Sequence, residues 1–340
     1  MKKRFILSLC LTLFNPAMAA AAEPIGSLGE GFLRQVQFLP DGTVLRVMAD
    51  RIEIVNPDTN EVIDKFAEGL NWRRVTLSQD GAWVATTTYL DGTRNPFIEI
   101  WEIATRKLIR RLESRLELVH IVAFSNTAPL LAVTYRDQIH LWNWKGNEYL
   151  GEMTGERRPP QNCYSRGNFG QHCSGPARIY SLAFSPDGQF LVAGSQRPDA
   201  EIWDISTRTL VGHLEEHADW VTHVSYSPDG RFIATARPES WVYLWDAQTR
   251  QRVRILYTGN VGEIQKLLFS SDSQRLYVAT QAPKWAIAPP NRRNYPIHVF
   301  DVHTGTQLNE FGDELFILED FSLSPDEKVA LLRYYINASC

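Results

Sequence analysis

The chain has 340 residues, of which 44% are hydrophobic, 11% aromatic and 22% charged, and this composition excludes an intrinsically disordered protein. Its formal net charge of −4 also excludes a general nucleic-acid binder, which would carry a surplus of basic residues. The length is sufficient to bury a large core within one domain.

The first 22 residues have the pattern of a secretory signal peptide. Three cations at positions 2–4 precede an apolar run from Phe5 to Phe14, and small residues follow around "AMA" at 17–19. We expect cleavage between Ala19 and Glu23, which leaves residues 23–340 with a formal charge of −7 because the three cations are removed. The mature chain is therefore expected in a bacterial periplasm or outside the cell. No later segment reaches the roughly 20 apolar residues of a membrane span, so no integral membrane protein is predicted.

A tight turn then recurs along the chain, with an alternating strand on each side. Proline at the first central position presets φ, and glycine tolerates positive φ, so Ser-Pro-Asp-Gly reverses the chain for a mechanical reason. Turns of this kind occur at "LPDG" 39–42, "SQDG" 78–81, "SNTA" 125–128, "SPDG" 185–188, "SPDG" 227–230, "SSDS" 270–273 and "SPDE" 324–327.

Each of the first six turns leads to an alternating strand that ends in a bulky residue. These residues are Val55, Trp101, Trp142, Trp203, Trp245 and Phe300. Their spacings of 46, 41, 61, 42 and 55 residues include the ~40–45 residues of a four-stranded propeller blade. The longer spacings indicate the same unit with inserted loops.

The motifs "SPDG", "IWD" at 202–204, "LWD" at 244–246 and "HADWV" at 217–221 resemble the WD40-repeat family. The resemblance implies an all-β, seven-bladed β-propeller of four-stranded antiparallel blades over residues 23–340. It also implies a hydrogen-bonded set in the fifth blade from His217, Thr235 and Trp245, although Arg237-Pro238-Glu239 stands near the expected aspartate. Trp101, Trp142 and Trp203 are expected to be structural anchors of the same kind.

The C-terminal end offers too little sequence for a full blade. "SPDEKVALLRYYINASC" has room for two inner strands, and residues 24–31 have room for one more. Either the last blade is incomplete or the chain is truncated, and an unpaired sheet edge invites a partner strand. We expect a monomer unless Cys340 or this open blade pairs with another chain.

Cys163 and Cys173 flank nine residues in "NCYSRGNFGQHC". An oxidising compartment favours a disulfide between them over free thiols. The zinc alternative needs four close ligands, and only His172 is added nearby, so no metal is predicted.

Two long insertions, residues 154–177 and 281–296, are expected on one face of the wheel, and both are basic and aromatic. Loops of this length are usually functional or flexible. The predicted binding residues are Arg158, Tyr164, Arg166, Arg197, Arg237, Trp285, Arg292, Arg293 and Tyr295. Arginine forks at these positions would bind an anionic partner, and the rings would add contact area. The alternative is that these charges are solvated and neutralised by nearby acids.

No catalytic motif accompanies this face, since the chain lacks a G-x-S-x-G elbow, an H-E-x-x-H pair and a dense calcium loop. The sequence therefore predicts a non-catalytic propeller of the cell envelope that binds a protein or peptide and uses no cofactor. The alternative is a lactonase-like or other small-molecule propeller hydrolase.

Overall fold

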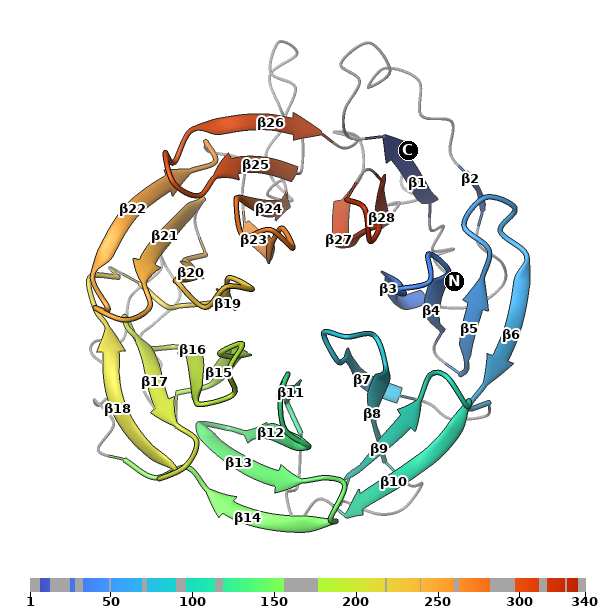
Figure 1. Cartoon of the computed structure of the whole chain (residues 1–340), viewed down its shortest axis with the longest axis horizontal. Helices are drawn as coiled ribbons and strands as arrows, with labels where there is room; N and C mark the ends of the chain where they lie inside the picture. The colour runs from blue at the N-terminus through green and yellow to red at the C-terminus, as the bar shows by residue number, and fades with distance from the viewer. Residues whose placement is uncertain are drawn as a thin grey trace, which may run out of the picture.

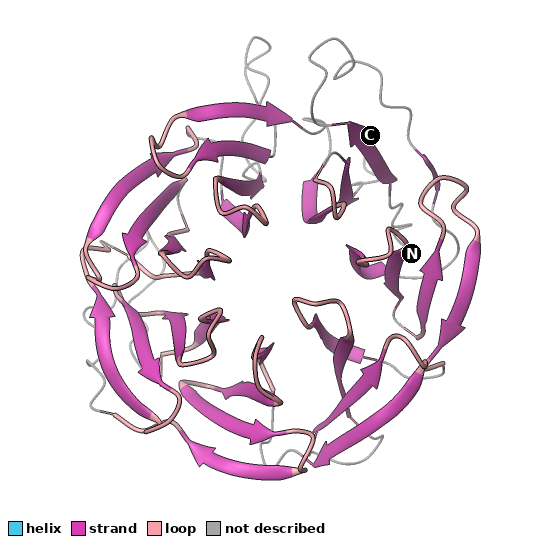
Figure 2. Cartoon of the chain, in the orientation of Figure 1, coloured by secondary structure: helices cyan, strands magenta, loops and turns pink. Residues whose placement is uncertain are grey.

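Strands joined by turns and loops make up all the regular secondary structure in the described part of the chain (Figure 2). In the computed structural model this part comprises residues 7–12, 25–27, 33–48, 50–68, 72–89, 96–113, 119–155, 177–217, 219–238, 240–259, 263–281, 297–311, 317–327 and 329–335.

Six four-stranded antiparallel sheets each use four consecutive strands, and they are numbered here as the first to sixth blades. The first three blades contain β3 (Leu33–Phe38), β4 (Val44–Met48), β5 (Ile52–Val55) and β6 (Val62–Phe66); β7 (Trp72–Leu77), β8 (Trp83–Tyr89), β9 (Pro96–Glu102) and β10 (Lys107–Glu113); and β11 (Val122–Phe124), β12 (Leu130–Tyr135), β13 (Gln138–Asn143) and β14 (Glu148–Glu152). The next three contain β15 (Ile179–Phe184), β16 (Phe190–Ser195), β17 (Ala200–Asp204) and β18 (Thr209–Leu214); β19 (His223–Tyr226), β20 (Phe232–Ala236), β21 (Trp241–Asp246) and β22 (Arg252–Tyr257); and β23 (Glu263–Phe269), β24 (Arg275–Gln281), β25 (Ile297–Asp301) and β26 (Gln307–Phe311).

The blades stand around a central axis with their first strands innermost and their fourth strands at the rim (Figure 1). This arrangement is the predicted all-β propeller of four-stranded antiparallel blades. The predicted bulky residues lie at or one residue before the ends of the third strands, as Trp245 does in β21 and Phe300 in β25.

One further four-stranded sheet is composite, because its strands come from both ends of the chain. Its order is β2 (Ile25–Ser27), β1 (Leu7–Thr12), β28 (Val329–Tyr335) and β27 (Ile317–Leu323). The predicted last blade thus differs from the other six: the C-terminal end contributes two strands, as predicted, and the N-terminal end contributes two where one was predicted. β1 lies within residues 1–22, the segment predicted to be a signal peptide, and pairs with β28 from Ser8 opposite Arg333 to Thr12 opposite Val329.

The core lies between neighbouring blades, whose sheets pack face to face. Val192 and Ile202 of the fourth blade contact Ile233 and Trp245 of the fifth in one cluster, and similar clusters join each neighbouring pair from the first blade to the sixth. Burial of each such large apolar side chain contributes about 1.5–3 kcal/mol, so the interblade contacts dominate the stability of the wheel.

The wheel has two different faces because every sheet is antiparallel. The turns between first and second strands, at 39–43, 78–82, 125–129, 185–189, 227–231 and 270–274, share the face called here the turn face. The opposite face, called the loop face, carries the ends where innermost strands begin and second strands end. The described residues that flank 156–176 and 282–296 lie at the loop face.

Candidate functional site

His217, Thr235 and Trp245 form one buried hydrogen-bond chain in the fifth blade. His217 Nε2 lies 2.7 Å from Thr235 Oγ1, and Trp245 Nε1 donates to the same oxygen at 2.8 Å. His217 Nδ1 lies 3.2 Å from the Leu214 carbonyl, and burial lowers the pKa of His217 to about 4. A neutral imidazole held on both nitrogens is a structural tie between the blade and the segment that precedes it.

The tryptophans at the ends of the third strands are packing residues. Trp142, Trp203 and Trp245 are buried in the interblade clusters, and Trp101 is half-buried against the cluster between the first and second blades. None of these rings belongs to an exposed binding surface.

Two of the predicted binding arginines lie within the described residues, and both guanidinium groups face other protein groups. Arg197 is only 4% exposed, and its nitrogens lie 3.8 Å from an Asp137 oxygen and 3.6 Å from a Glu201 oxygen. Arg237 is half-buried and donates to the Tyr243 hydroxyl at 3.2 Å. Arg197 thus lies beside two acids, one of which, Asp137, belongs to the neighbouring blade, whereas the contact of Arg237 is with a hydroxyl group.

The other predicted site residues lie outside the described residues. These are Arg158, Tyr164, Arg166, Trp285, Arg292, Arg293 and Tyr295, together with the predicted disulfide partners Cys163 and Cys173.

The structure brings together three basic groups that the sequence did not single out. Arg74 lies on β7, His120 just before β11 and Arg178 just before β15, so each stands where an innermost strand of neighbouring blades begins at the loop face. Partial desolvation and the charge of Arg178 lower the pKa of Arg74. Desolvation, Arg178 and Arg74 lower the pKa of His120. Arg178 therefore acts electrostatically on both Arg74 and His120, and the three groups are called here the basic cluster of the loop face.

An aromatic pair adjoins this basic cluster. The Arg178 guanidinium lies 5.9 Å from the centre of the Tyr180 ring, and the Tyr180 and Trp220 ring centres lie 6.0 Å apart. Trp220 is 37% exposed, whereas Trp72, which has a similar place before an innermost strand, is 0% exposed. Trp72 is therefore a core residue, whereas part of the Trp220 ring faces solvent.

Within the described ranges, no three His, Cys, Asp or Glu side chains are grouped so that they could hold a metal ion. The same residues include no helix that is long and apolar enough to cross a membrane.

Comparison with known proteins agrees with the repeat pattern. The family model described as "WD domain, G-beta repeat" matches residues 164–204 and 207–246. WD repeat and SOCS box-containing protein 1 of Mus musculus is 31% identical over 142 residues, which cover 41% of this chain and 28% of that protein. The Homo sapiens protein of the same name is 30% identical over 143 residues, with coverages of 42% and 28%. The match thus spans about 28% of the length of these relatives.

Among solved structures, a chain of "Crystal Structure of Mitotic Checkpoint Complex" superposes with a TM-score of 0.66 and 17% sequence identity, covering 90% of this chain and 89% of that one. At this identity the similarity shows the fold alone. The family model thus identifies WD40 repeats at residues 164–204 and 207–246, and the four-stranded blades around an axis give the chain the β-propeller fold.

Proposed function

We propose that the chain is a non-catalytic interaction scaffold whose loop face binds an anionic protein or peptide. The observation that carries this proposal is the basic cluster of Arg74, His120 and Arg178. The charge of Arg178 lowers the pKa of Arg74 and of His120, and an anion bound beside them would offset this repulsion, so the cluster gains more from an acidic partner than isolated surface arginines would.

The exposed ring of Trp220 beside this cluster adds apolar contact area to the same surface. Tryptophan and arginine are the residue types that contribute most to protein interfaces. The residues predicted on the two insertions, such as Arg166 and Arg292, would extend the surface outward, because both insertions leave the wheel at the loop face.

The envelope setting is part of the proposal and rests on the N-terminal pattern of residues 1–22. In an oxidising compartment, Cys163 and Cys173 would be joined and would stiffen the insertion between the third and fourth blades. We further propose that the wheel has seven blades, with β27 and β28 as the inner strands of the seventh; in a chain cleaved before Glu23, β2 and not β1 is the N-terminal strand available to it. In support, β27 lies beside β3 on one side and β23 on the other.

The test combines charge reversal with a matched control. The double variant Arg74→Glu/Arg178→Glu is compared with Lys65→Glu/Lys107→Glu, which changes charge equally at exposed positions on β6 and β10. Chemical cross-linking in envelope extract, followed by quantitative mass spectrometry, should recover the same partners with the native chain and the control. The loop-face variant should lose them while its melting temperature stays unchanged. Recovery of identical partners by the loop-face variant, or of none by the native chain, would contradict the proposal.

A further inference from the structure

The turn between the first two strands of the third blade departs from the serine-containing turns of the second, fourth, fifth and sixth blades. In the second blade, Ser78 Oγ donates to Asp80 Oδ1 at 2.5 Å and accepts from the Trp83 amide at 2.9 Å. The same pair of contacts recurs at Ser185, Ser227 and Ser270. The third blade has Thr127 where these turns have aspartate, so its serine lacks the carboxylate partner.

That serine, Ser125, is a buried hydroxyl without a hydrogen bond. It is 9% exposed, and its Oγ has no partner among the described residues. The Leu130 amide, which corresponds to the donor in the other turns, donates instead to the Ala128 carbonyl at 2.7 Å. Thr127 Oγ1 donates to the Asp187 carbonyl at 3.2 Å. Because no hydrogen bond engages the Ser125 hydroxyl, it can donate to a ligand, and a buried hydroxyl gains from a partner.

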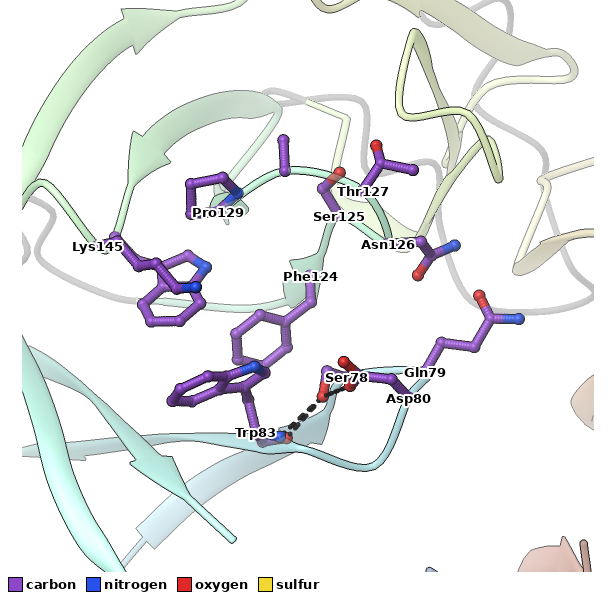
Figure 3. Close-up of a pocket in the computed structure, with 12 residues that line it drawn as sticks. Ser78, Gln79, Asp80, Trp83, Phe124, Ser125, Asn126, Thr127, Pro129 and Lys145 are labelled. Atoms are coloured by element: carbon purple, nitrogen blue, oxygen red, sulfur yellow. Dashed lines mark hydrogen bonds between the residues drawn. The ribbon is translucent and has the colours of Figure 1, made fainter. Parts of the chain in front are cut away.

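The same turn borders a pocket of about 410 Å³ between the second and third blades (Figure 3). Its aromatic wall consists of Trp83, Phe124 and Trp144, with the two tryptophan ring centres 4.8 Å apart and the Phe124 and Trp144 centres 6.2 Å apart. Pro129 and Ser125 also line the pocket. Its size is that of a small-ligand site, and polar side chains border the aromatic wall.

Lys145 supplies the one cationic side chain of this lining. Its Nζ lies 5.5 Å from the centre of the Trp83 ring and 5.4 Å from that of Trp144, so both rings hold the ammonium group at the pocket. No carboxylate in the described part of the chain forms an ion pair with it. Asp80, the only acid in the lining, directs Oδ1 to Ser78 Oγ and to the Ala82 amide.

We propose that this pocket is a second binding site, separate from the loop face, for an apolar group that carries one carboxylate. The carboxylate would pair with Lys145, the apolar group would lie against Trp83 and Phe124, and the Ser125 hydroxyl would gain its missing hydrogen bond. A single ammonium near Asp80 suits a monoanion better than a doubly charged phosphate, because a second negative charge would have no cation to balance it.

This chemistry is shared by a free small acid and by the C-terminal residue of a peptide. Two pairs of probes distinguish these sources: 3-phenylpropanoate with its amide, and N-acetyl-glycyl-phenylalanine with its C-terminal amide. Saturation-transfer NMR reports contact of the phenyl ring with the protein, and titration gives Kd for the native chain and each variant.

The expected result is binding of at least one carboxylate with at least tenfold preference over its amide. Lys145→Gln should weaken that binding about tenfold, and Ser125→Ala should weaken it about threefold to tenfold, as for the loss of one hydrogen bond. Lys107→Gln on the rim is the matched control and should leave Kd unchanged. Binding of the small acid alone would support a free metabolite, and binding of the peptide alone would support a peptide terminus.

Three results would overturn the proposal: equal affinity for the acids and their amides, an unchanged Kd in Lys145→Gln, or no binding of any probe at about 10 mM. A Kd of about 10 mM is taken here as the weakest affinity of functional use. Lys145 is exposed and forms no ion pair with a described residue, so Lys145→Gln should fold normally. A change in its Kd would then report the loss of the ammonium group and not a loss of structure. Because the site lies on the turn face, its failure would leave the loop-face proposal untouched, and the reverse also holds.

Discussion

Replacing serine by alanine in two equivalent turns should have opposite consequences for stability. Ser227 is 0% exposed, and its Oγ donates to Asp229 at 2.6 Å and accepts from the Phe232 amide at 2.9 Å. Loss of these two contacts, at about 1 kcal/mol each, should destabilise Ser227→Ala by about 2 kcal/mol. Ser125→Ala loses no hydrogen bond and removes a buried hydroxyl that has none, so its stability should be unchanged or higher by about 1 kcal/mol.

The assay is thermal unfolding of both variants and the native chain at one heating rate. At ~2.1 cal/mol/K per residue, a chain of this size has an unfolding entropy of roughly 0.7 kcal/mol/K, so 2 kcal/mol corresponds to about 3 °C. Ser227→Ala should melt about 3 °C below the native chain, and Ser125→Ala at the native temperature or slightly above it. Equal losses in the two variants would refute the assignment of Ser125 as a hydroxyl without a partner.

Three other changes test the buried groups of the wheel. Burial lowers the pKa of His217 from 6.5 to about 4, so as pH falls the unfolded chain takes up a proton on this ring before the folded chain does. The stability contributed by neutral His217 should therefore be lost as pH falls from about 6.5 to 4. An NMR titration that finds this ring at its ordinary pKa would contradict the burial argument. Arg46 pairs with Glu53 at 2.7 Å, and both side chains are buried. Arg46→Ala should therefore lower the free energy of unfolding in urea by about 3 kcal/mol. A decrease below about 1 kcal/mol would show that stability does not depend on this pair. Gly188→Ala should lower stability more than Gly42→Ala, although both residues have positive φ, because a Cβ at Gly188 would clash with the Thr127 hydroxyl whereas a Cβ at Gly42 would have no atom within 4 Å. Melting temperatures in the reverse order would refute this.

Much of the wheel could be predicted from local sequence because each blade repeats the same short-range physics. A Pro-Asp-Gly turn sets the reversal, and alternating apolar residues set the strand that follows, so "VYLW" becomes part of β21 and "IEIW" part of β9. The tight turns succeed as predictors because Gly188 and Gly230 adopt φ of +72°, which other residues rarely adopt.

The composite sheet could not be predicted in the same way, because its pairing joins the two ends of the chain. β1 and β28 lie more than 300 residues apart in sequence, and no local turn connects them. The apolar residues of β1 were interpreted as the core of a signal peptide, a pattern that an apolar strand shares. Experimental identification of the mature N-terminus would decide which role this segment has.

The basic cluster was missed for a different reason. Arg74, His120 and Arg178 look ordinary one by one, and only the ring brings the starts of three innermost strands together. Arg197 was grouped with the exposed loop arginines because of its place in the repeat, but Asp137 and Glu201 face its guanidinium in the folded chain. Positions in a repeat predict which loop a residue occupies, whereas exposure depends on its neighbours in the adjacent blade.

The central claim is that partners bind the loop face, and site-specific photocross-linking in cells tests it most directly. A photoreactive side chain is placed at Asp50, Arg136 or Glu216, which are exposed on the loop face outside the basic cluster, in one set, and at the exposed rim residues Ile63, Leu108 or Ile255 in the other. The account predicts that partner peptides are joined at the loop-face positions and not at the rim. Partner peptides joined only at the rim would contradict it.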